Sequence, residues 1–149
     1  MKKGILLIQL GTPDAPTVSR VRQYLRLFLS DKRVIDLPVL ARYILLYGII
    51  LPLRSKHSTK AYQAIWTDKG SPLRVLSIAL KEKLQRKLES SHTVALGMRY
   101  GKPSLKQALL DLNTCDEITV LPLYPQYASS TNGSSIEVVL NYFSQQDVM

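Results

Sequence analysis

The 149-residue sequence is poor in the side chains that most often bind metals or cross-link chains. It contains one cysteine, Cys115, and two histidines, His57 and His92. A single thiol cannot form an internal disulfide or a cysteine metal cluster, so we expect a reducing compartment. Neither histidine has a second ligand at helical or strand spacing. We therefore expect no metal site and no catalytic residue in this chain.

Long apolar runs are also lacking. The most apolar stretch, residues 43–51, is flanked by Arg42 and Arg54 and is too short to span a bilayer. The apolar run near the amino terminus is short, is interrupted by Gln9 and has no small-residue cleavage site after it, which argues against a signal peptide. We interpret that run as a first buried strand.

Acidic residues are outnumbered, with 11 Asp and Glu against 20 Lys and Arg, for a formal charge of +9. This excess is compatible with a solvated basic surface, an anionic lipid, an acidic small molecule or a nucleic acid. There is no zinc-finger spacing, no RNA-binding signature and no basic block interleaved with aromatics. Nucleic acid is therefore the weakest of these options, and our first expectation is no nucleic-acid partner.

The apolar pattern alternates between strands and helices. We predict strands at 4–10, 93–98 and 117–123, a short extended piece at 34–37, and helices at 17–29, 58–66, 73–88, 104–112 and 136–143. This order is typical of an α/β fold, an open, mostly parallel sheet with helices on both faces. The apolar stretch between Pro38 and Leu53 has two interpretations, a core helix or an exposed apolar lip, and composition alone favours the core helix.

Ligands of such sheets bind at the carboxyl ends of the strands. The segments that follow the three predicted strands, 11–16, 99–103 and 124–135, are rich in Gly, Pro, Tyr and hydroxyl residues. Gly11-Thr12-Pro13 is neither a dinucleotide fingerprint nor a P-loop, and is most simply a tight turn.

Each of the other two segments offers a functional interpretation. Arg99 and Tyr100 can pair with a carboxylate and stack on a ring, or can form a surface ion pair and a partly buried aromatic. Tyr124 and Tyr127 bracket a stiffening proline, and the hydroxyl-rich segment after them is either an anion site at a helix start or a solvated loop.

Taken together, six ordered blocks resemble the amino-terminal half of the ferrochelatases. The blocks are 4–16 (GILLIQLGTPDAP), 24–34 (YLRLFLSDKRV), 48–54 (GIILPLR), 61–72 (AYQAIWTDKGSP), 98–104 (MRYGKPS) and 120–135 (VLPLYPQYASSTNGSS). The resemblance implies a fold of two similar α/β lobes around a cleft, with residues 1–149 forming the first lobe and the second lobe absent. It also implies a lyase of haem biosynthesis that inserts ferrous iron into protoporphyrin IX, or into coproporphyrin III in one branch.

The resemblance also implies which residues bind the porphyrin. A porphyrin is an apolar disc with carboxylates on one edge, so its site needs an apolar slot with a few fixed polar groups. The residues at matching positions are Leu10, Arg54, Tyr62, Ser71, Arg99, Tyr100, Tyr124 and Tyr127. Arg54, Tyr62 and Ser71 match positions that bind the ring and its propionates, and Arg99 and Tyr100 match a pair that lines the cleft.

The stretch from Val39 to Leu53 matches an apolar lip over the mouth of the cleft. The resemblance therefore reverses the preference for a core helix. It implies a cytoplasmic protein that contacts the inner face of a membrane through this lip, and the basic charge is compatible with anionic lipid.

Two departures from the family limit what this chain can do. Some members bind a [2Fe–2S] cluster through a cysteine at the position of Ser129, so we expect no cluster here and no permanent cofactor. The catalytic histidine of the family, which removes the pyrrole protons as the metal enters, lies in the second lobe. We therefore expect the chain alone to be inactive or incomplete and to need a carboxy-terminal lobe as partner.

Three rival interpretations remain at this point. The chain can be a non-catalytic tetrapyrrole-binding or carrier module, a chelatase for another tetrapyrrole, or a basic α/β nucleic-acid-binding domain. Porphyrin binding separates the first two from the third, and an active second lobe separates a chelatase from a carrier.

Overall fold

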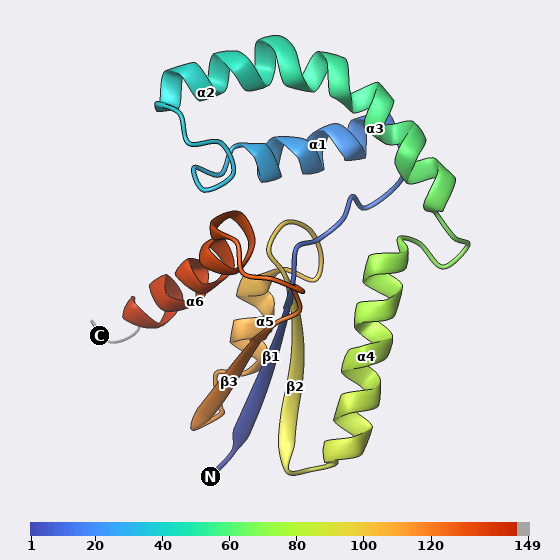
Figure 1. Ribbon diagram of the computed structural model, residues 1–149. Coiled ribbons are helices and arrows are strands. Elements are labelled where there is room, and N and C mark those ends of the chain that lie inside the picture. Colours follow the sequence, from blue (N-terminus) through green and yellow to red (C-terminus); the bar gives the residue numbers. More distant parts are fainter. Residues whose placement is uncertain (146–149) are drawn as a thin grey trace. The chain divides into compact units, whose positions relative to one another are not determined.

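The structure is a computed structural model that describes residues 1–145 (Figure 1). The chain divides into two compact units. One unit comprises Met1–Gly11 together with the chain from Leu76 onward, and the other comprises Thr12–Val75.

The first unit contains a parallel sheet of three strands in the order β2-β1-β3 (Figure 1). The strands are β1 (Lys3–Gln9), β2 (His92–Met98) and β3 (Glu117–Pro122). In the register, Leu6 of β1 pairs with Ala95 of β2 and with Val120 of β3. The central strand is fully buried at Leu6, Leu7 and Ile8, as expected for a strand covered on both faces.

Helices cover both faces of this sheet. Leu6 and Ile8 pack on one face against α5 (Leu105–Asp111) and α6 (Ser134–Ser144). Leu7 packs on the other face with Leu84 and Leu88 of α4 (Pro72–Leu88). Because successive side chains of a strand point to opposite faces, one apolar run builds both layers. This confirms the predicted α/β class with an open parallel sheet between helices.

The second unit is helical. It contains α1 (Val18–Leu29), α2 (Val39–Leu45), a π-helical turn η1 (Leu46–Ile50) and α3 (Leu51–Ile65). Thr17 caps α1, and its hydroxyl accepts a hydrogen bond from the backbone N–H of Arg20 at 3.4 Å. The inner face of α1 is built from Val21, Tyr24, Leu25 and Leu29.

The helix predicted at 58–66 begins earlier, because helical residues run without a break from Val39 to Ile65. Pro52 lies in the first turn of α3, directly after η1. A proline lacks the backbone N–H that a continuous helix uses, and Pro52 stands where the hydrogen-bond spacing changes from that of a π-helix to that of an α-helix. The apolar segment and the predicted helix are therefore consecutive parts of one helical run.

Two other local predictions are wrong. Residues 34–37 do not form an extended piece, because the backbone N–H groups of Val34 and Ile35 both donate to the carbonyl oxygen of Asp31 in a turn. The last helix does not begin at residue 136. A π-helical turn η2 (Ser129–Gly133) leads directly into α6 at Ser134.

The helical run exposes most of its apolar side chains within the described chain. Its buried residues include Arg42, Leu46 and Leu51. Between Val39 and Leu53, its exposed large apolar residues are Val39, Leu40, Tyr43, Ile44, Tyr47, Ile49 and Leu53. We call these seven side chains the apolar lip. Among residues 1–145, no helix combines the length and the apolar character needed to cross a membrane.

Candidate functional site

The carboxyl ends of β1 and β2 are joined by backbone hydrogen bonds. The N–H of Arg99 donates to the carbonyl oxygen of Gln9, and the N–H of Tyr100 donates to that of Leu10, each at 2.8 Å. Gly11 follows with a φ of +112°, and a Cβ atom there would lie 1.7 Å from the carbonyl oxygen of Tyr100. Only glycine fits this close approach, which sets Leu10 beside Tyr100.

Arg99 is held by groups from β2 and α6. Its Nε donates a 2.8 Å hydrogen bond to the hydroxyl oxygen of Ser134. Its Cζ lies 4.5 Å from the centre of the Tyr100 ring, a cation–π distance. The Tyr100 hydroxyl lies 3.3 Å from the same Ser134 hydroxyl, and both residues are buried. One buried serine thus fixes both members of the predicted pair.

Tyr124 forms a second contact with the start of α6. Its hydroxyl lies 3.0 Å from the hydroxyl of Ser135. Burial raises the pKa of Tyr124, while the hydrogen bond with Ser135 and the positive charge of Arg99 act in the opposite direction. Tyr127, the other tyrosine of this segment, is largely exposed.

Sequence reasoning missed the roles of Ser134 and Ser135. Both lie in the hydroxyl-rich segment that the sequence marked either as an anion site or as a solvated loop. Both are almost completely inaccessible to solvent, so the solvated-loop interpretation fails at these two positions. Their hydroxyls bond to Arg99, Tyr100 and Tyr124. Composition marked the segment but could not select the two serines.

The other predicted binding residues lie in the second unit. Ser71 is buried and accepts a 2.8 Å hydrogen bond from the hydroxyl of Thr12, also buried. The Tyr62 ring meets the Tyr24 ring edge-on, with centroids 6.3 Å apart. Burial raises the pKa of Tyr62, and its hydrogen bond with Tyr24 lowers that pKa in part. Arg54 is exposed on α3.

The predicted residues therefore fall into two groups. Leu10, Arg99, Tyr100, Tyr124 and Tyr127 belong to the first unit, where all but Tyr127 lie in or beside one hydrogen-bonded network at the carboxyl edge of the sheet. Arg54, Tyr62 and Ser71 belong to the second unit.

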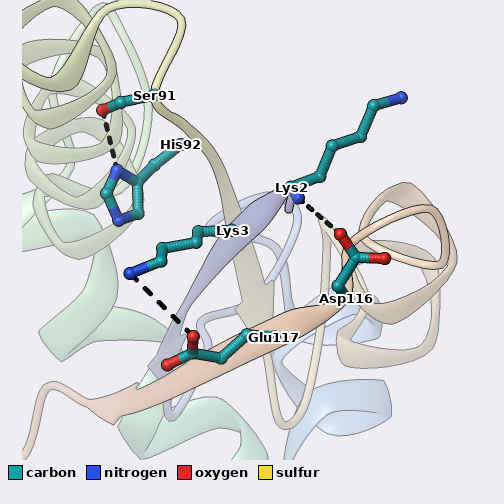
Figure 2. Close-up of polar contacts among 6 residues, drawn as sticks. All are labelled: Lys2, Lys3, Ser91, His92, Asp116 and Glu117. Atoms are coloured by element: carbon teal, nitrogen blue, oxygen red, sulfur yellow. Dashed lines mark hydrogen bonds and ion pairs between the residues drawn. The ribbon is translucent and has the colours of Figure 1, made fainter.

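Neither histidine takes part in the hydrogen-bonded network of the first unit. His92 begins β2, so it is at the amino edge of the sheet, where its Nδ1 lies 2.8 Å from the hydroxyl of Ser91 (Figure 2). The same edge carries an ion pair of 4.0 Å between Lys3 and Glu117, and the backbone N–H of Lys2 donates to Asp116 (Figure 2). His57 is exposed on α3 in the other unit.

Within residues 1–145, no group of three or more His, Cys, Asp or Glu side chains is placed to hold a metal ion. Ser129, at the position considered for a cluster ligand, is exposed at the start of η2.

Comparison with known proteins identifies relatives along the whole chain. The Ferrochelatase family model matches residues 2–149. Ferrochelatase from Legionella pneumophila (strain Paris) is 53% identical over 149 residues, which are 100% of this chain and 45% of the Legionella protein. Ferrochelatase from Coxiella burnetii (strain RSA 493 / Nine Mile phase I) is 51% identical over 152 residues, covering 99% of this chain and 43% of that protein.

The chain thus spans somewhat less than half the length of these relatives and corresponds to their amino-terminal half. The resemblance seen in six separate blocks extends over the entire sequence, and the structure has the parallel α/β sheet that it implied. This chain belongs to the ferrochelatase family.

Proposed function

We propose that this chain provides the porphyrin-binding half of a ferrochelatase that inserts ferrous iron into protoporphyrin IX. The observation that carries the proposal is the network at the carboxyl edge of the sheet, where Ser134 holds Arg99 and Tyr100 and Ser135 holds Tyr124. The family membership and the names of the relatives support the reaction class.

The chemistry of this network suits a flat anionic ligand. Arg99 supplies a planar cation whose orientation is fixed by Ser134 and by the Tyr100 ring. The buried Tyr100 ring supports the guanidinium group from one side, and the half-buried Tyr124 supplies aromatic surface near it. A rigid cation next to aromatic faces can bind a macrocycle that is apolar over its area and carries carboxylates at one edge.

Arg54, Tyr62 and Ser71 are proposed to bind the same substrate, because they occupy the family's porphyrin-binding positions. The hydroxyl of Thr12 donates to the hydroxyl oxygen of Ser71, which helps to fix the Ser71 side chain. The base that removes the pyrrole protons is proposed to come from a carboxy-terminal lobe. Ferrous iron is a substrate in this scheme, and the chain is proposed to hold no permanent cofactor and no [2Fe–2S] cluster.

The apolar lip is proposed to contact a membrane surface from the cytoplasmic side. Seven large apolar side chains exposed on one helical run are more than scattered surface residues and mark an interaction surface. A membrane is the surface into which an apolar porphyrin partitions, so this contact would place the substrate near its site.

A porphyrin titration tests the binding function. Protoporphyrin IX and coproporphyrin III are added separately to the purified chain, and the shift of the Soret band is followed. We expect saturable binding that weakens about tenfold in Arg99→Gln, the loss typical of one charge-assisted contact. Arg86→Gln, an equal charge change on the surface of α4, is the matched control. Absence of a Soret shift would contradict the proposal.

A metallation assay tests whether the chain binds the porphyrin without inserting the metal. The chain alone, under anaerobic conditions with Fe²⁺ and protoporphyrin IX, is expected to form protohaem no faster than the protein-free mixture. Rapid insertion by the chain alone would show that the base lies within it. Porphyrin binding without insertion, even after a carboxy-terminal lobe is joined to it, would identify a carrier module.

A further inference from the structure

The second unit contains a cavity of about 780 Å³ that the proposed porphyrin site does not use. It lies between α1 and the η1–α3 segment and is lined by Val18, Ser19, Arg22, Gln23, Arg26, Tyr47, Leu51 and Pro52. None of the predicted porphyrin-binding residues belongs to this lining. Its size is that of a typical small-ligand site.

The lining of the cavity combines cationic and apolar side chains. Arg22 and Arg26 are one helical turn apart on α1, so both guanidinium groups are on the same side of that helix. Val18 adds apolar surface to the α1 wall of the cavity. Leu51 and Pro52 supply apolar surface from α3. The Nε of Arg22 is 3.5 Å from the hydroxyl of Ser55, a contact that ties the arginine to α3.

The charged residues that line the cavity, Arg22 and Arg26, are both cations. Neither of the two stretches that line it, residues 15–30 and 37–67, contains an Asp or a Glu. The ion pairs Lys3–Glu117 and Arg74–Asp14 do not involve an arginine of the cavity. Two arginines in a concave site without acidic residues are complementary to an anion.

Tyr47 connects this cavity to the apolar lip. It lines the cavity, it is itself 48% exposed, and its ring stacks on that of Tyr43, another lip residue. Tyrosine favours the boundary between the apolar and aqueous regions of a membrane. A ligand in this cavity would therefore have its anionic part near Arg22 and Arg26 while the lip side chains lie in apolar surroundings.

We propose that the cavity binds the head group of an anionic glycerophospholipid, with Arg22 and Arg26 contacting its phosphate. The inference rests on the proposed membrane contact of the apolar lip and deepens it, because it adds a lipid preference to a surface that would otherwise be only apolar. An anionic lipid satisfies both halves of the surface at once, the apolar lip through its acyl region and the arginines through its head group.

Vesicle co-sedimentation of the 149-residue chain tests the proposal. Vesicles of phosphatidylcholine alone are compared with vesicles that contain phosphatidylglycerol. Arg22→Gln/Arg26→Gln is compared with Lys56→Gln/Lys60→Gln, which removes the same charge from exposed positions of α3 that do not line the cavity. We expect the cavity variant to lose about tenfold or more of its affinity for phosphatidylglycerol vesicles, and the matched control to lose clearly less.

Other results of the co-sedimentation experiment would contradict parts of the proposal. Equal losses in the two double variants would show a diffuse basic surface and overturn the site. Wild-type binding that is equal on both vesicle types would leave the membrane contact standing and overturn the lipid preference. A Leu40→Ser/Ile44→Ser variant tests the lip separately, because it should lose binding to both vesicle types. If the wild-type chain bound no vesicles, both the lip contact and the lipid site would be wrong.

Two further measurements separate other occupants of the cavity. Inorganic phosphate that displaces the chain from phosphatidylglycerol vesicles at an ionic strength matched with chloride would identify a free-anion site and overturn the lipid assignment. A cavity variant that lost porphyrin affinity but kept its vesicle binding would assign the cavity to the tetrapyrrole. Unchanged circular dichroism of both double variants supports a comparison between folded proteins.

Discussion

Arg99 and Ser134 are joined by a 2.8 Å hydrogen bond from Nε to the serine hydroxyl, although 35 positions separate them in the sequence. Ser134 is 1% exposed, so its hydroxyl exchanges little with water and is well placed to fix the arginine. The first residue of α6 thus orients the first residue after β2. This contact makes Ser134 a positioning residue for the proposed porphyrin site.

Replacing Ser134 with alanine should weaken porphyrin binding without unfolding the chain. The change removes a hydrogen bond to a charged group, an interaction that contributes about 1.5–3 kcal/mol. We expect Ser134→Ala to bind protoporphyrin IX about tenfold more weakly in a Soret titration. Ser144→Ala, on the exposed last turn of α6, is the control and should bind like the wild type. Equal affinities of the two variants would show that Ser134 does not position Arg99.

The raised pKa of Tyr124 predicts a loss of stability at alkaline pH. The folded chain holds the phenol proton more tightly than the unfolded chain, whose tyrosine has a pKa of 10.0. The contribution of the protonated Tyr124 phenol to the free energy of unfolding is therefore complete below pH 10.0. It is lost as pH rises through the higher folded-state pKa. Urea denaturation at a series of pH values should show a shallower decline above pH 10.0 in Tyr124→Phe than in the wild type. Tyr127→Phe, at an exposed position, should decline as the wild type does.

Two glycines should respond to alanine in opposite ways. Gly11 has a positive φ, and its added Cβ would overlap the carbonyl group of Tyr100, so Gly11→Ala should destabilise the chain by about 4 kcal/mol or more, or prevent folding. Gly48 lies in η1, and a Cβ there meets nothing within 4 Å. Gly48→Ala should stabilise by about 0.5–1 kcal/mol through helix propensity. Chemical denaturation measures both, and a tolerated Gly11→Ala would contradict the geometry beside Leu10.

Gln85 of α4 acts as a substitute for a neighbouring strand at the outer edge of β2. Its Oε1 accepts the backbone N–H of Val94 and its Nε2 donates to the carbonyl oxygen of His92, both at 2.8 Å. Gln85→Ala should lose about 1–3 kcal/mol of stability and should associate more readily, because strand edges without partners pair with other chains.

Gln107→Ala is the matched control for Gln85→Ala, because Gln107 forms its side-chain hydrogen bond with Asp111 on the exposed side of α5. Calorimetry and sedimentation of the two variants make the comparison. If both behaved alike, the amide of Gln85 would not protect the edge.

Local sequence patterns predicted most of the elements because each depends on neighbouring residues. The three strands follow from short apolar runs, and α1 follows from Thr17 and the helical spacing of Val21 and Leu25. The errors arose where a local signal was misleading. The helix predicted at 58–66 was too short because the apolar stretch before it was treated as a separate element, whereas helical residues run on from Val39 to Ile65. Val34 favours extended structure, but Asp31 accepts the backbone hydrogen bonds that close a turn there.

The candidate site was only partly predictable, because local patterns identify residues that follow strands but not the side chains that become buried. Arg99, Tyr100 and Tyr124 were found because they follow strands, and parallel strands end at one edge of their sheet. Ser134 and Ser135 were not singled out, since a serine in a hydroxyl-rich segment looks the same whether it faces water or an arginine. Burial decides between these roles, and burial depends on how α6 packs on the sheet.

By itself, the sequence determined the α/β class, the family and the residues at the carboxyl ends of the strands. These follow from apolar periodicity and from ordered motifs, which are properties of the chain read in one dimension. Tertiary structure alone decided that Ser134 holds Arg99, that Gln85 covers an edge of β2, and that Arg22 and Arg26 share a cavity with Tyr47. Each of these depends on side chains from different elements meeting in space, and only packing brings such groups together.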